Sequence, residues 1–131
     1  MKSPFPKRYW TRASIEFLSE KFDHPIFDYE QDWAYTVADF GRLDAYLSVF
    51  RERSINDDIR FTLGDMIIQA FEDEGDLAAD PRWVEFLAHV SADFRIHAHQ
   101  VWYWAATDTP LADSWKVSPW MRELLREKSP G

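Results

Sequence analysis

Hydrophobic side chains recur three or four positions apart along most of this 131-residue chain, which is the spacing of amphipathic helices. Short polar residues and prolines divide the pattern into separate segments. We expect a break near Ser91, because one helix of about 25 residues across that point would be long for so small a chain. The pattern predicts helices over about residues 8–22, 42–50, 57–74, 81–90, 92–106 and 119–128.

Residues that favour helix ends lie beside several of these segments. Asp39 precedes one periodic segment, and another begins near Asn56, Asp57 or Asp58. The short side chains of these residues can accept hydrogen bonds from the free N–H groups of a first turn. Asp80 followed by Pro81 is the pattern of an N-cap and a first helical residue. Gly75 follows the third predicted helix and favours its end.

Residues 29–38 follow a different period. Trp33, Tyr35 and Val37 alternate there with polar or small residues, which is typical of a strand or an extended segment. No other segment offers this stretch a strand partner, so an isolated extended segment is expected rather than a sheet. The sequence thus predicts a single domain over residues 1–131 that is all-α or nearly so, a compact bundle of about five to six helices with one extended segment near residues 29–38.

The composition narrows the classes of function. The absence of cysteine excludes disulfides, thiolate metal sites and a cysteine nucleophile. The N-terminal residues lack the apolar run of a signal peptide, and no apolar run approaches the ~20 residues that cross a bilayer, so we expect a soluble cytoplasmic protein. The 23 Asp and Glu exceed the 15 Lys and Arg by a net charge of -8. This charge disfavours nucleic acid and membrane surfaces as partners and favours a basic protein.

Acidic residues concentrate between residues 57 and 80, where Arg60 is the only base. Glu72, Asp73 and Glu74 end a predicted helix, where the helix dipole is negative and cations would be preferred. Helix stability therefore does not explain these acids. They form either a solvated, solubilising turn or, together with Asp76, an electrostatic docking surface for a basic partner.

Aromatic residues supply the second half of such a surface. They make up 17% of the chain, and most are expected in the core. Tyr, Trp and Phe that remain partly exposed beside acids are common anchors of protein interfaces. We expect such anchors in segments whose periodicity does not demand burial. The candidate partner-binding residues are Glu72, Asp73, Glu74, Asp76, Trp33, Tyr35, Trp102 and Trp115.

The histidines of "RIHAHQVWYW" raise the question of a metal or acid–base site. In a helix His97 and His99 lie about 200° apart, so they cannot share a metal ion. Asp93 lies four residues before His97 and could orient its imidazole as a general base, but the chain has no nucleophile turn and no phosphate-binding loop. The alternative is a hydrogen-bonded histidine of the core or a surface pair. We expect no catalytic residue, metal ligand or cofactor, and hence a protein that is not an enzyme.

The stretch "DDIRFTLGDMIIQAFEDE", together with "WVEFLAHV" and "HAHQVWYWA", resembles small acidic bacterial proteins of uncharacterised function, some of which are toxin-immunity proteins. The resemblance is one of helix composition. It implies an immunity or antitoxin protein without catalytic residues, which neutralises a cognate toxin by occluding its active or substrate-binding site. Two alternatives stay open: a small hydrolytic enzyme that uses Asp93 and His97, and a homo-oligomeric scaffold, such as a homodimer, built on exposed Trp and Tyr.

Overall fold

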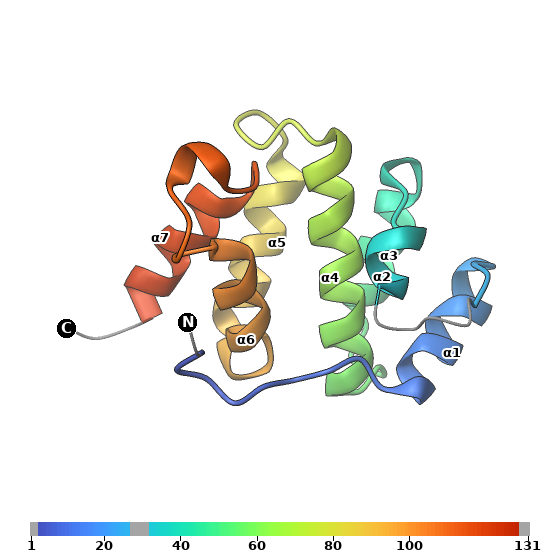
Figure 1. Cartoon of the computed structure of the whole chain (residues 1–131). Coiled ribbons are helices and arrows are strands. Elements are labelled where there is room, and N and C mark those ends of the chain that lie inside the picture. The colour runs from blue at the N-terminus through green and yellow to red at the C-terminus, as the bar shows by residue number, and fades with distance from the viewer. Residues whose placement is uncertain (1–2, 27–31, 129–131) are drawn as a thin grey trace. The chain divides into compact units, whose positions relative to one another are not determined.

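A computed structural model describes residues 3–26 and 32–128 of the chain (Figure 1). Over these residues it contains seven α-helices, two short 3₁₀ helices and no strand, so the predicted all-α class is confirmed. None of the helices in this described part is long and apolar enough to cross a membrane. The helices fall into two units. We call Tyr9–Gly75 the N-terminal unit, and residues 3–8 with 76–128 the C-terminal unit. The prediction of a single domain stays a prediction, and each unit is described by itself.

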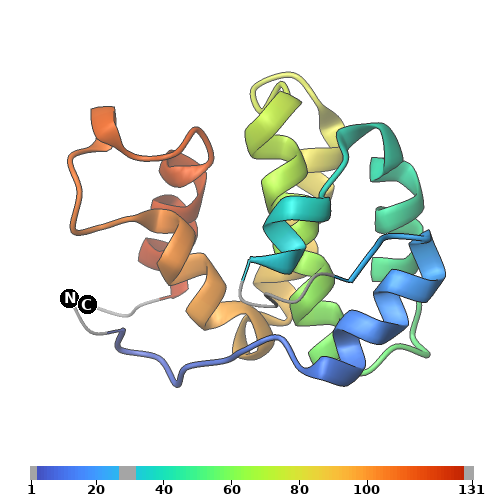
Figure 2. The ribbon, with the colours of Figure 1, turned by 45° about the vertical axis from the view of Figure 1, so that its right-hand side comes forward.

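The N-terminal unit is built around one long helix, α4 (Asp57–Glu74). Of the three residues near which the helix is expected to begin, Asn56 is the cap, because its side-chain oxygen accepts a hydrogen bond from the N–H of Ile59 at 2.8 Å. Almost every residue from Ile59 to Phe71 is buried, since other helices cover α4 on several sides. They are α1 (Arg12–Phe22), α2 (Trp33–Val37), the 3₁₀ helix η1 (Phe40–Arg42) and α3 (Leu43–Phe50) (Figures 1 and 2).

Polar contacts join α1 and Trp10, two residues before it, to α4. The indole Nε1 of Trp10 donates to the buried carboxylate of Asp65 at 2.8 Å, and the hydroxyls of Ser14 and Thr62 lie 2.8 Å apart. Thr11 caps α1 through a reciprocal capping box with Ser14. The predicted helix start near residue 8 is therefore too early. Thr11 ends the extended chain there, and Trp10 packs from outside the helix.

The predicted extended segment near residues 29–38 is wrong where the structure describes it, because Trp33–Val37 is the helix α2. Residues 29–31 of that prediction lie outside the described residues. Trp33, Ala34 and Val37 are buried together, which is the spacing of one helical face. A run of five residues fits both periods, and packing against α4 selects the helix.

The C-terminal unit contains α5 (Pro81–Ala92), α6 (Phe94–Ala105), the 3₁₀ helix η2 (Leu111–Asp113) and α7 (Ser118–Lys128). α6 packs against both α5 and α7, and Figure 2 shows α6 (light orange) beside α7. The expected break near Ser91 occurs at Asp93. From the N-terminal residues, the ring of Phe5 packs edge-on against Phe94 with centroids 5.6 Å apart.

Candidate functional site

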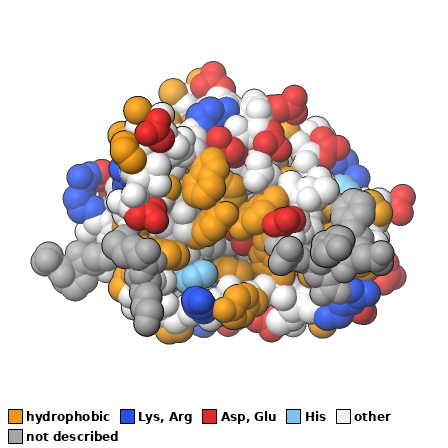
Figure 3. Space-filling model, viewed as in Figure 1, with side chains coloured by type: hydrophobic (Ala, Val, Ile, Leu, Met, Phe, Trp, Pro, Cys, Tyr) orange, Lys and Arg blue, Asp and Glu red, His pale blue; other side chains and the backbone are white. Residues whose placement is uncertain are grey.

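The predicted acidic surface lies at the carboxyl end of α4. Asp73 and Glu74 are exposed and Glu72 is half-buried, and the last turn of the helix contains no basic residue. Gln69 donates to the Asp73 carboxylate at 2.7 Å. Figure 3 shows acidic side chains on the surface over this end of α4. Asp76 is also exposed, but it follows Gly75 and belongs to the C-terminal unit.

The net charge of the protein is confined to one unit. Tyr9–Gly75 contains six Lys and Arg and fifteen Asp and Glu, a net charge of -9. The rest of the chain contains nine Lys and Arg and eight Asp and Glu, a net charge of +1. The two net charges add up to the total of -8. A basic partner would therefore be attracted to the N-terminal unit rather than to the chain as a whole.

Trp33 cannot form part of an exposed interface, so its prediction as a partner-binding residue is wrong. Its side chain is fully buried, and its indole Nε1 donates to the carbonyl of Pro25 at 2.7 Å. Tyr35 is half-buried, because its ring packs edge-on against Trp10 with centroids 5.0 Å apart. Of these two predicted anchors, only Tyr35 reaches the surface.

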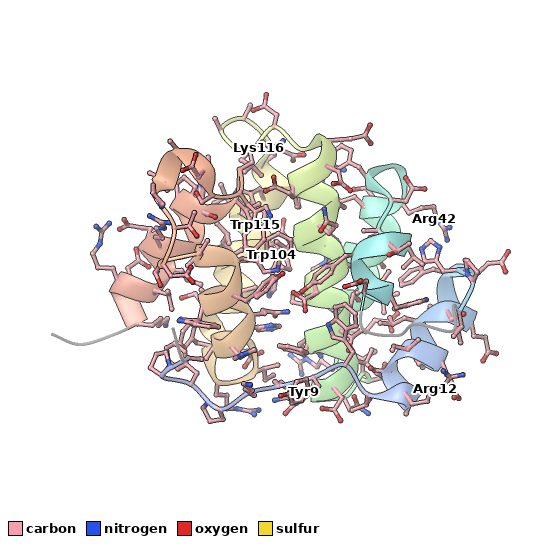
Figure 4. The ribbon with its side chains drawn as sticks, viewed as in Figure 1. Tyr9, Arg12, Arg42, Trp104, Trp115 and Lys116 are labelled. Carbon is pink, nitrogen blue, oxygen red and sulfur yellow. The ribbon has the colours of Figure 1, made fainter. Side chains whose placement is uncertain are left out.

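The other two predicted aromatics lie in the C-terminal unit. Trp102 is half-buried beside the ring of His99, at 5.6 Å between centroids, and its buried Nε1 has no hydrogen-bond partner among the described residues. Trp115 is 36% exposed and packs against Trp104 and Tyr103, with centroids 4.9 and 5.1 Å away. Figure 4 shows the side chains of Trp104 and Trp115 next to each other.

Tyr103 is a surface aromatic that the sequence interpretation missed. It is 40% exposed, whereas Trp104 beside it is buried. The helical period contained the signal, because Gln100, Val101 and Trp104 define the buried face of α6 and leave Tyr103 on the outside. We call the exposed faces of Tyr103 and Trp115, supported by Trp104, the aromatic platform.

Hydrogen bonds hold the chain segment 106–117 that carries Trp115. Ala106, which follows the last residue of α6, adopts the left-handed conformation (φ 50°) and turns the chain away from the helix axis. Arg122 of α7 then binds three carbonyl oxygens, those of Ala105, Ala106 and Thr109, each at 2.7 Å. Ser118 donates to the carbonyl of Trp104 at 2.7 Å and accepts from the N–H of Trp115 at 3.1 Å. The platform is therefore held in place before any partner binds.

The structure does not bring Asp93 and His97 together. His97 is completely buried, and its Nδ1 pairs with the side-chain oxygen of Gln100, whereas Asp93 is exposed at the junction of α5 and α6. His99 lies at the surface side of α6, half-buried, and burial together with the charge of Lys7 lowers the pKa of its imidazole. Among the described residues no group of three or more acids and histidines could hold a metal ion.

A second histidine site links α1 to α3 in the N-terminal unit. The Nε2 of His24 lies 2.7 Å from the hydroxyl of Tyr46, which is fully buried. Burial, more than the charge of Arg42, lowers the pKa of His24, while Asp39 and Asp23 oppose the shift. Burial also raises the pKa of Tyr46 to about 12, although a backbone hydrogen bond from Asp39 lowers it. The lowered pKa of His24 favours a neutral imidazole, whose Nε2 can accept a hydrogen bond from the Tyr46 O–H.

We expect this link to weaken in acid. The pKa of His24 in the folded protein lies below its ordinary value of 6.5, so the folded state binds the proton less readily than the unfolded state. The contribution of neutral His24 to the free energy of unfolding is therefore complete above pH 6.5 and is lost as the pH falls through the folded pKa. Chemical denaturation between pH 5 and pH 8 should show a smaller loss of stability in acid for His24→Gln than for wild type. His89→Gln, at an exposed position, is the control, and equal pH dependence in wild type and His24→Gln would contradict the expectation.

Comparisons of the chain with protein-family models, with curated proteins and with solved structures found no match.

Proposed function

We propose that the protein is a protein-binding module for a basic partner and, most concretely, a cytoplasmic immunity or antitoxin protein that occludes the active or substrate-binding site of a cognate bacterial toxin. The observation that carries the proposal is the confinement of the net charge to Tyr9–Gly75, at -9 against +1 elsewhere. The immunity role itself rests on the resemblance of helix composition.

The position of the acids at the end of α4 supports a role in binding. Asp73 and Glu74 are exposed where the helix dipole is already negative, and each such placement costs the helix about 0.3–1 kcal/mol when salt is low. No base of the same turn offsets this cost. A basic surface on a partner would gain from the same negative potential, because oppositely charged surfaces steer each other during encounter.

Capture from an extract of the native host tests this proposal with matched baits. The first bait is the wild-type chain, and the second carries Glu72→Lys, Asp73→Lys and Glu74→Lys. The third carries the same change of charge on exposed acids of the C-terminal unit, as Asp93→Lys, Glu123→Lys and Glu127→Lys.

At about 50 mM salt we expect the wild-type bait and the third bait to retain one basic protein. The second bait should lose this protein or retain at least 10-fold less of it. An acidic captured protein, or equal retention by the second and third baits, would count against the acidic surface. Enzymatic activity of the captured protein that the wild-type chain abolishes at equal molar amounts is the expected sign of immunity function, and unimpaired activity in the complex would remove that role.

A further inference from the structure

The aromatic platform is an exposed pair of rings on a rigid support. Tyr103 is 40% and Trp115 36% exposed, and their rings lie 5.1 Å apart at an angle of 33°. Leu111, in the segment between them, is 51% exposed, and Figure 3 shows hydrophobic side chains on the surface over α6 and this segment. Tyr and Trp in such positions are the residues that most often dominate the energy of protein interfaces.

Contacts within the chain itself hold the platform in place. Arg122 fixes the preceding turn through three carbonyl oxygens, and Ser118 ties the backbone of Trp115 to that of Trp104. A surface that is already held in its binding geometry loses less entropy when a partner docks.

The segment 106–117, which carries Trp115, contains two acids and one base, and this balance favours a cation as ligand. Asp108 and Asp113 are exposed in the segment 106–117, and neither carboxylate forms an ion pair among the described residues. The Thr109 hydroxyl donates to Asp108 at 3.4 Å. Lys116, the single base of this segment, already interacts within the chain. The segment that carries Trp115 thus also carries two exposed carboxylates.

We propose that the aromatic platform binds an arginine side chain of the basic partner, with the guanidinium stacked on Tyr103 and Trp115 and paired with Asp113. This inference rests on the proposed function, which supplies a basic partner, and it names a contact in the C-terminal unit. A guanidinium fits better than an ammonium because it is planar, stacks on aromatic rings and is less strongly hydrated. A second copy of the chain that docks through the same segment is disfavoured, because Asp108 and Asp113 of the two copies would come together and repel each other.

The experiment is a titration of the full chain, labelled with ¹⁵N, followed through the tryptophan indole signals. The probe is the peptide acetyl-Gly-Arg-Arg-Gly-amide, and the matched peptides carry citrulline or lysine in place of arginine. Citrulline keeps the shape of arginine without its charge. The signal of Trp115, assigned through Trp115→Phe, should shift with the arginine peptide, less with the lysine peptide and hardly at all with the citrulline peptide.

Two variants of the platform should weaken this binding. Tyr103→Ala is expected to lower the affinity about five-fold, the size of one exposed cation–π contact. Asp113→Asn, which keeps the size of the side chain, is expected to lower it at least two-fold. Tyr9→Ala is the control, because Tyr9 is an exposed tyrosine of the other unit at 68% exposure.

Equal affinity for the citrulline peptide would overturn the proposal, as would peptide shifts confined to the N-terminal unit. A shift of the Trp115 signal with protein concentration alone would identify a second copy as the occupant and overturn it as well. Failure here is distinguishable from failure of the proposed function, since the three lysine substitutions on α4 test that function through other residues.

Discussion

Trp33→Ala is expected to lower the free energy of unfolding by about 3–5 kcal/mol, the usual cost of deleting a fully buried indole. The side chain has no exposed surface, and its Nε1 donates to the carbonyl of Pro25. The substitution leaves a cavity beneath α2, on the face that packs against α4, and also leaves that carbonyl without its donor. Urea denaturation followed by circular dichroism measures the change.

Trp115→Ala is the matched control for this prediction. It removes the same side chain from a position that is 36% exposed, so the loss should stay below about 2 kcal/mol. The two variants therefore separate a tryptophan of the core from one of the surface. A loss for Trp33→Ala no larger than that for Trp115→Ala would contradict the burial of Trp33.

Arg122→Met should have the second large effect, a loss of about 2–4 kcal/mol. The guanidinium donates to three carbonyl oxygens, and hydrogen bonds from a charged donor contribute about 1.5–3 kcal/mol each without being additive. Methionine keeps the apolar stem and removes the donors. Hydrogen exchange should also quicken in residues 106–117, because the turn that carries the aromatic platform loses its anchor.

Arg126→Met provides the control on the same helix. Arg126 pairs with Glu123 at the surface, where both side chains are largely exposed, and such pairs contribute about 0–1 kcal/mol. Equal destabilisation by the two substitutions, or unchanged exchange in residues 106–117 of Arg122→Met, would show that Arg122 does not hold the segment.

Local chemistry determined much of the fold and could be interpreted from the sequence. Asn56 caps α4 and Asp80 caps α5, each through a hydrogen bond to a nearby backbone N–H. Pro81 occupies the first turn of α5, and Gly75 follows the last residue of α4. These signals act within a few residues, so they do not depend on the rest of the chain.

Features that depend on distant residues could not be predicted in this way. The helix α2 forms because its buried face packs on α4, and its five residues are too few to show a period of their own. Asp65, a carboxylate inside an apolar helix, finds its donor in Trp10, 55 positions away. The long-range partner of such a group cannot be inferred from local spacing.

The candidate site was predictable in part for the same reason. The surface position of the acids from Glu72 to Glu74 could be predicted, because charged residues at a helix end rarely become fully buried. The exposed aromatic residues were harder to predict. Trp33 was predicted at the surface and lies in the core, whereas Tyr103 was not among the predicted residues and is exposed. Exposure of an aromatic ring depends on which helix face is covered, and in α6 that face is set by packing against α5 and α7.

The central claim, that the acids of the N-terminal unit attract a basic partner, is tested most directly by the salt dependence of the association rate. The captured partner is mixed with the wild-type chain and with the variant carrying lysine at positions 72–74, between about 20 and 500 mM salt. We expect the wild-type rate to fall steeply as salt increases, and the variant rate to be at least 10-fold lower at low salt and nearly independent of it. Equal rates and equal salt dependence for the two chains would contradict the claim.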